Sequence, residues 1–138
     1  MRQRVPVSQI MAKAIIVVNP TKKISEVNQM FNEYGIRHIP VVEGTKLIGV
    51  VSKNDVLKIG YSTGDTHPDA LNAIYDTYEL KDIMVTNPVT VTADTNIKEV
   101  AEILAEQSFH SLPVVEKDEV VGIVTTTDLV KYLLDQYK

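Results

Sequence analysis

The chain has no cysteine and no tryptophan, and phenylalanine occurs only twice in its 138 residues. Without cysteine there is no disulfide framework and no zinc site built on thiolates. No apolar run approaches the ~20 residues that a membrane-spanning helix needs. Arg2 and Arg4 near the start are not followed by the apolar segment of a signal peptide, so we expect a cytoplasmic protein.

Motifs for catalysis and for metal binding are also missing. The three histidines, His38, His67 and His110, are far apart and lack the short spacing of metal ligands. The chain has no Gly-x-Ser-x-Gly turn, no phosphate-binding P-loop and no recognisable nucleophile–base pair. We therefore expect neither an enzyme nor a metalloprotein.

Charge is unevenly spread along the chain. Residues 1–58 hold nine Lys or Arg and four Asp or Glu, whereas residues 59–138 hold five and fourteen. The basic residues of the first part are scattered and form no stripe, which argues against a nucleic-acid partner. Two interpretations remain open: solvated faces that attract an oppositely charged surface, and an anion-binding site in the first half.

An internal repeat organises the sequence. Shifted by 73 residues, the chain matches itself without a gap over residues 10–58, with 15 identities in 49 aligned positions. Ile10-Met11 aligns with Ile83-Met84, and Pro40–Glu43 aligns with Pro113–Glu116. A long gapless match at a single offset indicates one fold used twice.

Each copy shows the same succession of patterns. A short apolar stretch precedes an amphipathic helix, and two β-rich runs joined by a hairpin turn precede a closing helix. The expected ranges are Ile15–Val18, Ile24–Tyr34, Ile39–Val42, Leu47–Val51 and Asn54–Ile59 in the first copy, and Val89–Val91, Ile97–Leu104, Leu112–Val115, Val120–Val124 and Thr127–Gln136 in the second.

This pattern predicts an α+β fold of two βαββα repeats. A single repeat cannot bury the apolar face of its three-stranded sheet, so we expect the two copies to pack sheet-to-sheet with pseudo-two-fold symmetry. The expected division is a first repeat over 1–59, a connector over 60–79 and a second repeat over 80–138. Within the connector, Pro68 followed by apolar residues at helical spacing predicts a short, packed helix.

The chemically informative segments are Gly49–Asp55 and Gly122–Asp128, in which a strand gives way to a helix. Both contain Gly, two apolar residues, a hydroxyl residue, two variable positions and Asp. A helix N-terminus attracts phosphate, the hydroxyl adds a donor, and the Asp can accept both hydrogen bonds of a ribose diol. The same spacing is that of a capping box, in which the hydroxyl and the carboxylate only cap the helix. From the residues alone, both interpretations remain open.

Together with the segments before it, this junction resembles the cystathionine-β-synthase (CBS) repeat. Each junction follows an apolar-Pro-Val-Val segment, Ile39–Val42 or Leu112–Val115, and a methionine stands 29 residues before each Pro. The resemblance covers roughly residues 5–58 and 78–135. It implies that the two repeats form a Bateman module, which binds AMP, ADP, ATP or S-adenosylmethionine in clefts between the repeats.

The resemblance also implies roles for individual residues. Asp55 and Asp128 would hold the ribose of the ligand. Phosphate or ribose would be met by polar residues of the junctions and of the segments just before the Pro motifs, namely Ser52, Asn54, Thr125, Thr127, Arg37, His38, His110 and Ser111. The adenine ring would be flanked by apolar residues of the first strand and of the segment after the first helix, namely Ile16, Ile36, Val89 and Phe109.

We therefore expect a stand-alone regulatory module that binds an adenosine nucleotide, requires no cofactor and signals to a partner protein. Modules of this family pair into discs, so the resemblance also implies a homodimer. The alternative is a dimerising interaction scaffold without a ligand, in which Asp55 and Asp128 serve only as helix caps.

Overall fold

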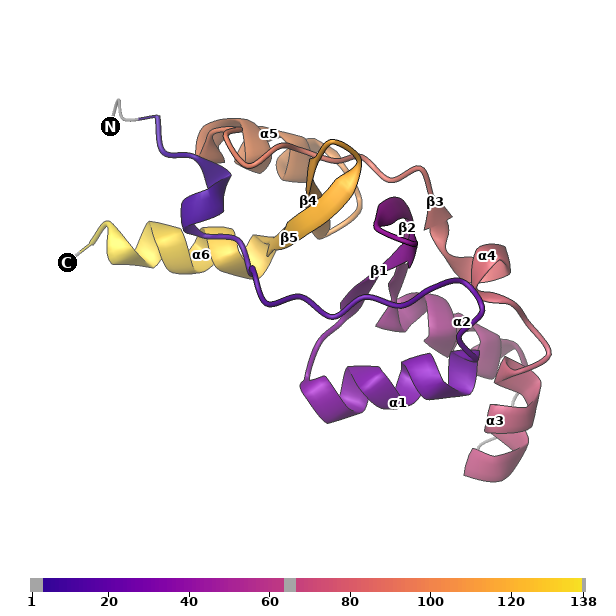
Figure 1. Ribbon diagram of the computed structural model, residues 1–138. Coiled ribbons are helices and arrows are strands. Elements are labelled where there is room, and N and C mark those ends of the chain that lie inside the picture. The colour runs from indigo at the N-terminus through magenta and orange to yellow at the C-terminus, as the bar shows by residue number, and fades with distance from the viewer. Residues whose placement is uncertain (1–3, 64–66, 138) are drawn as a thin grey trace. The chain divides into compact units, whose positions relative to one another are not determined.

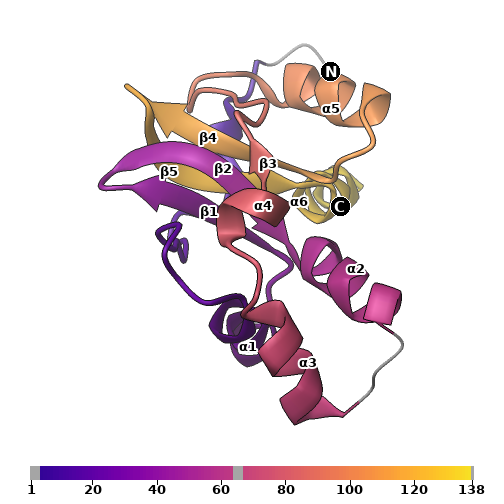
Figure 2. The ribbon, with the colours of Figure 1, turned by 90° about the vertical axis from the view of Figure 1, so that its right-hand side faces the viewer.

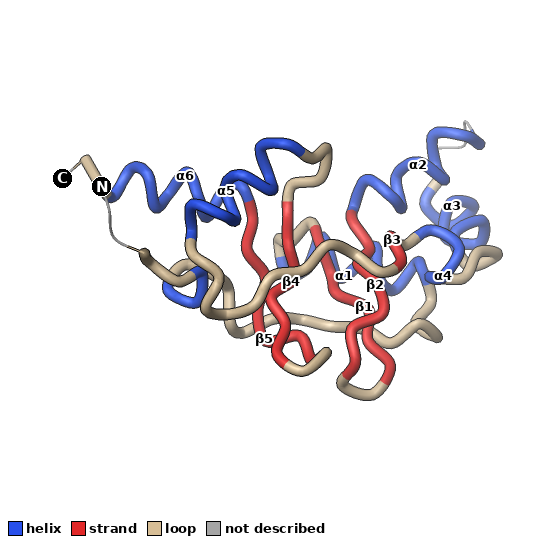
Figure 3. The backbone as a smooth tube through the Cα atoms, turned by 90° about the horizontal axis from the view of Figure 1, so that it is seen from above, coloured by secondary structure: helices blue, strands red, loops and turns tan. Residues whose placement is uncertain are grey.

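The computed structural model describes residues 4–63 and 67–137. The chain divides into a central unit, Ile16–Asn87, and a terminal unit, which combines Met1–Ile15 with Pro88–Lys138. Figure 3 shows the same succession of helix, β-hairpin and helix in each unit. The predicted α+β class and the predicted use of one motif twice are therefore confirmed.

The central unit is built on a β-hairpin with helices on one side of it. Its elements are α1 (Ile24–Tyr34), β1 (His38–Glu43), β2 (Lys46–Ser52), α2 (Lys53–Thr63), α3 (Pro68–Tyr75), α4 (Leu80–Ile83) and β3 (Val85–Thr86). β1 and β2 pair antiparallel, with His38 opposite Ser52, and β3 adds antiparallel to β2. Figure 2 shows α1, α2 and α3 on the same side of the β1–β2 hairpin.

The terminal unit repeats this hairpin with the same register. Its elements are the 3₁₀-helix η1 (Val7–Gln9), α5 (Ile97–Glu106), β4 (Ser111–Glu116), β5 (Glu119–Thr125) and α6 (Thr126–Asp135), which are labelled in Figure 1 except for η1. Ser111 lies opposite Thr125, as His38 lies opposite Ser52. In both hairpins the register shifts within the Val-Val pair, between Val41 and Val42 and between Val114 and Val115. The duplication in sequence is therefore a duplication of backbone geometry.

Both hairpins turn through residues with positive φ. Gly44 has φ 62° in the central unit, and Lys117 and Asp118 have φ 52° and 69° in the terminal unit. Glu43 pairs with Lys46, and Glu116 with Glu119 in the corresponding turn. The predicted hairpin turns are confirmed, although the second one places two side-chain-bearing residues in the left-handed region.

The first strand of each predicted βαββα unit is shorter than expected. Of Ile15–Val18 only Val18 forms a bridge, parallel to Val41, and of Val89–Val91 only Val91 does so, parallel to Val114. Pro20 cannot donate a hydrogen bond to continue the first pairing. In the terminal unit a local turn follows Val91, in which the N–H of Thr92 donates to Thr95 Oγ1 at 3.1 Å. Local turns therefore end both strands after one bridge.

The compact units are divided differently from the sequence repeats. The start of the second predicted repeat, Leu80–Thr86, lies in the central unit, where β3 pairs with β2. The start of the first predicted repeat lies in the terminal unit, where Ala12 bridges Ile123. Strand pairing, which the linear pattern does not reveal, therefore assigns each N-terminal segment to the other copy's hairpin.

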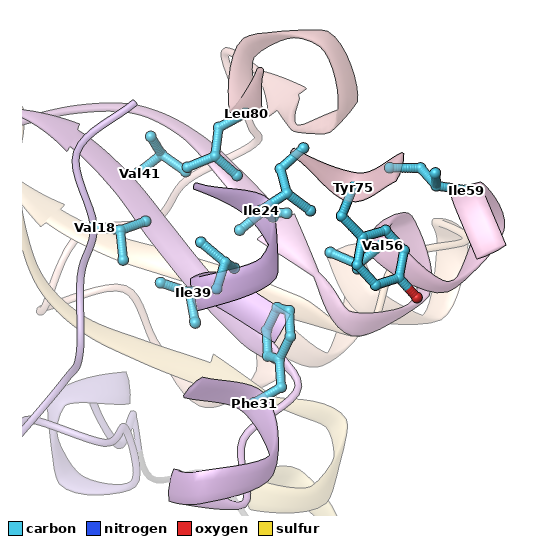
Figure 4. Close-up of a cluster of buried hydrophobic side chains, with 11 residues drawn as sticks. Val18, Ile24, Phe31, Ile39, Val41, Val56, Ile59, Tyr75 and Leu80 are labelled. Carbon is cyan, nitrogen blue, oxygen red and sulfur yellow. The ribbon is translucent and has the colours of Figure 1, made fainter. Parts of the chain in front are cut away.

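The core of the central unit lies between its hairpin and its helices. Figure 4 shows Phe31 of α1, Ile39 of β1 and Val56 of α2 converging in this cluster, with Tyr75 of α3 beside them. Tyr75 is only 4% exposed, and Leu71 and Ile74 pack against the same cluster. The predicted connector helix and its packing role are thus confirmed, and α3 begins with Pro68 in its first turn.

Candidate functional site

The central junction is the point where β2 ends at Ser52 and α2 begins at Lys53. The N–H of Lys53 donates to the carbonyl oxygen of Arg37 at 2.9 Å. His38 pairs with Ser52 across the hairpin. The segment before the Pro motif is therefore held against the start of α2, which brings the backbones of Arg37, His38 and Ser52 together.

A reciprocal pair of hydrogen bonds fixes the carboxylate of this junction. The N–H of Ser52 donates to Asp55 Oδ2 at 2.8 Å, and the N–H of Asp55 donates to Ser52 Oγ at 3.1 Å. This is the capping box that the spacing left open, so Asp55 caps α2 in this structure. No hydrogen bond to its other oxygen, Oδ1, is present among the described residues.

The terminal junction has the same hydrogen bonds at positions 73 residues later. The N–H of Thr126 donates to the carbonyl oxygen of His110 at 3.0 Å. The N–H of Thr125 donates to Asp128 Oδ2 at 2.9 Å, and the N–H of Asp128 donates to Thr125 Oγ1 at 3.2 Å. A capping box thus forms here as well. The two junctions therefore share their hydrogen bonds and differ in their side chains.

These hydrogen bonds also determine which backbone N–H groups at the starts of α2 and α6 remain available to a ligand. In α2 the N–H groups of Lys53 and Asp55 are already used. The N–H of Asn54, between them, has no hydrogen-bond partner within residues 4–63 and 67–137, and the same holds for Thr127 in α6. Both side chains are exposed. A ligand at either junction would therefore meet one backbone donor and one exposed polar side chain from the first helical turn.

The apolar candidates divide into packed and accessible residues. Ile36 packs against the core of the central unit and Phe109 against that of the terminal unit. Ile16 is half-buried, whereas Val89 is 48% exposed. Because the bridges of Val18 and Val91 are parallel, Ile16 and Val89 lie toward the junction ends of β1 and β4.

Ser111 differs from the other polar candidates because it is buried. Its exposed fraction is 7%, while its counterpart His38 is half-buried. A ligand would reach the Ser111 hydroxyl only if the local packing opened. The remaining polar candidates are exposed or half-buried, namely Arg37, Ser52, Asn54, Asp55, His110, Thr125, Thr127 and Asp128.

Two further features of the junctions were not among the predicted site residues. Lys53 directs its ammonium group to Asn32 Oδ1 of α1 at 3.4 Å. Gly49 of β2 faces Met84, whose Sδ lies 2.6 Å from the position that a Cβ on Gly49 would take. Neither contact has a signal in the linear spacing, because Asn32 and Met84 are distant in sequence from the residues that they touch.

Within the part of the chain that the structure describes, no group of three or more His, Cys, Asp or Glu side chains is arranged to hold a metal ion. None of the described helices is both long and apolar enough to span a bilayer.

Comparison with known proteins defines the family. The model of the CBS domain matches residues 7–61 and again residues 80–135. The chain therefore belongs to the CBS-domain family and contains two CBS domains, so the resemblance inferred from the sequence is confirmed.

Two solved structures of CBS-domain pairs resemble the whole chain. The crystal structure of CBSX2 of Arabidopsis thaliana in complex with AMP has a TM-score of 0.81 and 26% identity, covering 97% of this chain and 99% of that one. The CBS domain pair of protein MJ0100 in complex with 5-methylthioadenosine and S-adenosyl-L-methionine has a TM-score of 0.81 and 25% identity, with coverage of 97% and 99%.

An enzyme is also among the relatives. Inosine-5'-monophosphate dehydrogenase of Korarchaeum cryptofilum is 32% identical over 116 residues, which are 83% of this chain and 21% of that protein. Two relatives from Methanocaldococcus jannaschii are likewise longer, and the chain spans 45% and 46% of them. The similarity thus extends over less than half of these proteins.

Proposed function

We propose that this protein is a regulatory module that binds an adenosine nucleotide at its strand-to-helix junctions and transmits binding to a partner protein. The observation that carries the proposal is the duplicated junction itself. In both units the same hydrogen bonds hold an Asp carboxylate, a hydroxyl residue and the segment before the Pro motif together. Such a repeated polar arrangement suits a ligand with a ribose diol and a phosphate.

Capping and ribose binding are compatible uses of the same carboxylate. The capping box engages only Oδ2 of Asp55 and of Asp128. A carboxylate oxygen has two lone-pair directions, and Oδ1 lies outside the box. The cap fixes the orientation of the carboxylate before a ligand arrives, which lowers the ordering cost of binding.

The relatives support adenosine as the ligand class. CBSX2 was solved with AMP, and the MJ0100 pair with 5-methylthioadenosine and S-adenosyl-L-methionine. These three ligands share an adenosine moiety and differ in what is attached to its 5' carbon. We therefore propose that the junctions recognise adenosine. That the ligand lies between the repeats, and how many phosphates it carries, are separate predictions.

We also propose that the chain itself performs no catalysis, because only a fifth of the dehydrogenase is matched.

Thermal melting with added ligand tests the proposal. A ligand that binds only the native state raises the melting temperature, and at 100 times Kd it contributes about 2.7 kcal/mol. We expect 1 mM AMP, ADP, ATP or S-adenosylmethionine to raise the melting temperature of the native chain, and at least one of them to do so by several degrees. No shift with any of the four would contradict nucleotide binding and would leave the ligand-free scaffold.

Variants separate binding from capping. Asp55→Ala and Asp128→Ala each remove a cap and a proposed ribose ligand, so both the stability and the ligand-induced shift should fall. Asn96→Ala is the matched control, because Asn96 caps α5 by accepting from the N–H of Glu99 at 2.8 Å and lies outside the junctions. It should lose a similar ~1 kcal/mol of stability but keep the full ligand-induced shift.

The proposed homodimer has support from α6. None of its residues is buried, and Val130, Leu133 and Leu134, at helical spacing, are 55%, 55% and 63% exposed, with Tyr137 just beyond the helix 79% exposed. An apolar stripe of this kind can pack on the same stripe of a second copy, as in an isologous dimer. Leu134→Glu should convert a dimer into a monomer in light scattering, whereas Gln136→Glu at the C-cap of the same helix should not.

A further inference from the structure

We propose that the two junctions differ in the phosphate charge that they accept, with Arg37 and Lys53 making the central junction the one for the more highly phosphorylated nucleotide. This inference rests on the proposed function and deepens it. The two junctions share their backbone hydrogen bonds, so their side chains alone distinguish them.

Arg37 and Lys53, the two cationic residues of the central junction, meet through their backbones at the start of α2. The hydrogen bond from the Lys53 N–H to the Arg37 carbonyl oxygen, at 2.9 Å, joins the two residues directly. At the aligned positions the terminal junction has His110 and Thr126, joined by the same bond at 3.0 Å. With Asp55 and Asp128 included, and with histidine neutral, the central junction carries one net positive charge and the terminal junction one net negative charge.

The position of these cations is unfavourable without an anion. The N-terminus of a helix already carries a partial positive charge, so Lys53 as the first residue of α2, with Arg37 bonded to it through the backbone, raises the local positive potential. Arg37 is exposed and forms no ion pair within residues 4–63 and 67–137. Asp55 is oriented by its capping bonds to the backbone. An anionic ligand with several phosphates would relieve this excess of positive charge.

A contact with α1 also distinguishes the two units. Asn32 Oδ1 accepts a hydrogen bond from Lys53 Nζ at 3.4 Å, which holds the lysine beside the junction. The residue aligned with Asn32 in the terminal unit is Ala105, and the residue aligned with Lys53 is Thr126. Both the cation and the group that contacts it are therefore specific to the central unit. The long, exposed hydrogen bond leaves the lysine able to turn toward a phosphate.

Exchanging the side chains between the junctions tests the inference. Arg37→His with Lys53→Thr gives the central junction the residues of the terminal one, and His110→Arg with Thr126→Lys does the reverse. Both pairs keep the backbone bonds, because a backbone N–H and a backbone carbonyl form them. Calorimetric titration with AMP and with ATP, without divalent cations, gives the affinity ratio of the two nucleotides for each chain.

We expect the first exchange to lower the affinity for ATP relative to AMP by about tenfold, and the reverse exchange to raise it. An exposed ion pair changes affinity by up to about fivefold, and two cations act here. In the native chain, added NaCl should weaken ATP binding more steeply than AMP binding. This salt titration does not depend on the variants folding.

The outcomes separate the two proposals. If the native chain binds neither nucleotide, the proposed function fails and this inference fails with it. If the native chain binds and the ATP to AMP ratio stays the same in both exchanged chains, nucleotide binding stands and the charge selectivity is wrong. Loss of ATP preference in the Asp55→Ala chain, together with its retention in the Asp128→Ala chain, would further assign the preference to the central junction.

Discussion

Met84 occupies the space that a side chain on Gly49 would need. Its Sδ lies 2.6 Å from the position of a Cβ on Gly49, and Met11 lies at the same 2.6 Å from that of Gly122. In each case the carbonyl oxygen of the next residue, Val85 or Ala12, lies 2.8 Å from the same position. Glycine in the CBS motif of this chain is therefore required by the close approach of a second segment to the strand.

Gly49→Ala should consequently destabilise the protein by about 1–3 kcal/mol, as overpacking of a tight interior does. The methionine side chain can move away, but the Val85 carbonyl belongs to β3, which is paired with β2. Urea denaturation measures the loss, with Thr45→Ala in the exposed hairpin turn as a control that should change stability by less than ~0.5 kcal/mol. Full recovery of stability in the Gly49→Ala/Met84→Ala double variant would show that the backbone contact is unimportant.

The close approach of Met84 to Gly49 is a feature that the sequence did not predict. The alternation and helical spacing of apolar residues predicted the hairpins, α1, α5 and the connector helix α3, because each depends on local periodicity. The packing of Met11 on Gly122, and of Met84 on Gly49, joins residues far apart in the chain, and no local pattern encodes it. For the same reason the boundaries of the compact units differ from those of the sequence repeats.

The candidate site was predictable in part. The spacing of Ser52 and Asp55 allowed a capping box or a ribose site, and the structure establishes the box. The hydrogen bond that joins Lys53 to Arg37 follows from the register of β1 on β2, which became visible only in the fold. The burial of Ser111, which weakens its expected role in binding, likewise depends on packing that the sequence does not state.

A second prediction concerns the bond between α1 and the end of α3. Asp76 accepts from the N–H of Ser25 at 3.0 Å and from the Ser25 hydroxyl at 2.9 Å, so it caps a helix that has no cap of its own. Ser25→Ala and Asp76→Ala should each cost about 0.5–2 kcal/mol of stability, Asp76→Ala more, because it removes both bonds. A double-mutant cycle in urea should give a coupling of about 0.5–1.5 kcal/mol.

Asn72→Ala serves as the control for this cycle. Asn72 is an exposed residue of α3, and no side-chain hydrogen bond of Asn72 occurs in the described part of the chain. Its substitution should show no coupling to Ser25→Ala. Additive effects of Ser25→Ala and Asp76→Ala would mean that the side-chain bond contributes nothing to stability.

A third prediction is a stabilising substitution in the turn between β4 and β5. Lys117 and Asp118 have φ 52° and 69°, a region that costs side-chain-bearing residues free energy and that glycine enters readily. Asp118→Gly should therefore raise the stability by about 0.5–1 kcal/mol, with the greater freedom of glycine in the unfolded chain limiting the gain. Thermal melting measures it. Glu119→Gly, one residue later in β5, should lower the stability instead, since glycine weakens a strand.

A fourth prediction tests how firmly α3 belongs to the core of the central unit. Tyr75 is 4% exposed within the cluster that contains Val56 and Ile59, and its hydroxyl lies 3.2 Å from the position of a Cβ on Gly60. Tyr75→Ala should cost about 3–5 kcal/mol, as truncation of a buried aromatic residue does, and should increase amide hydrogen exchange throughout α3. Tyr78→Ala, at a tyrosine that is 42% exposed, should cost less than ~1 kcal/mol and leave exchange in α3 unchanged. If Tyr75→Ala cost as little stability as Tyr78→Ala, the connector helix would contribute little to the core that it shares with α1 and α2.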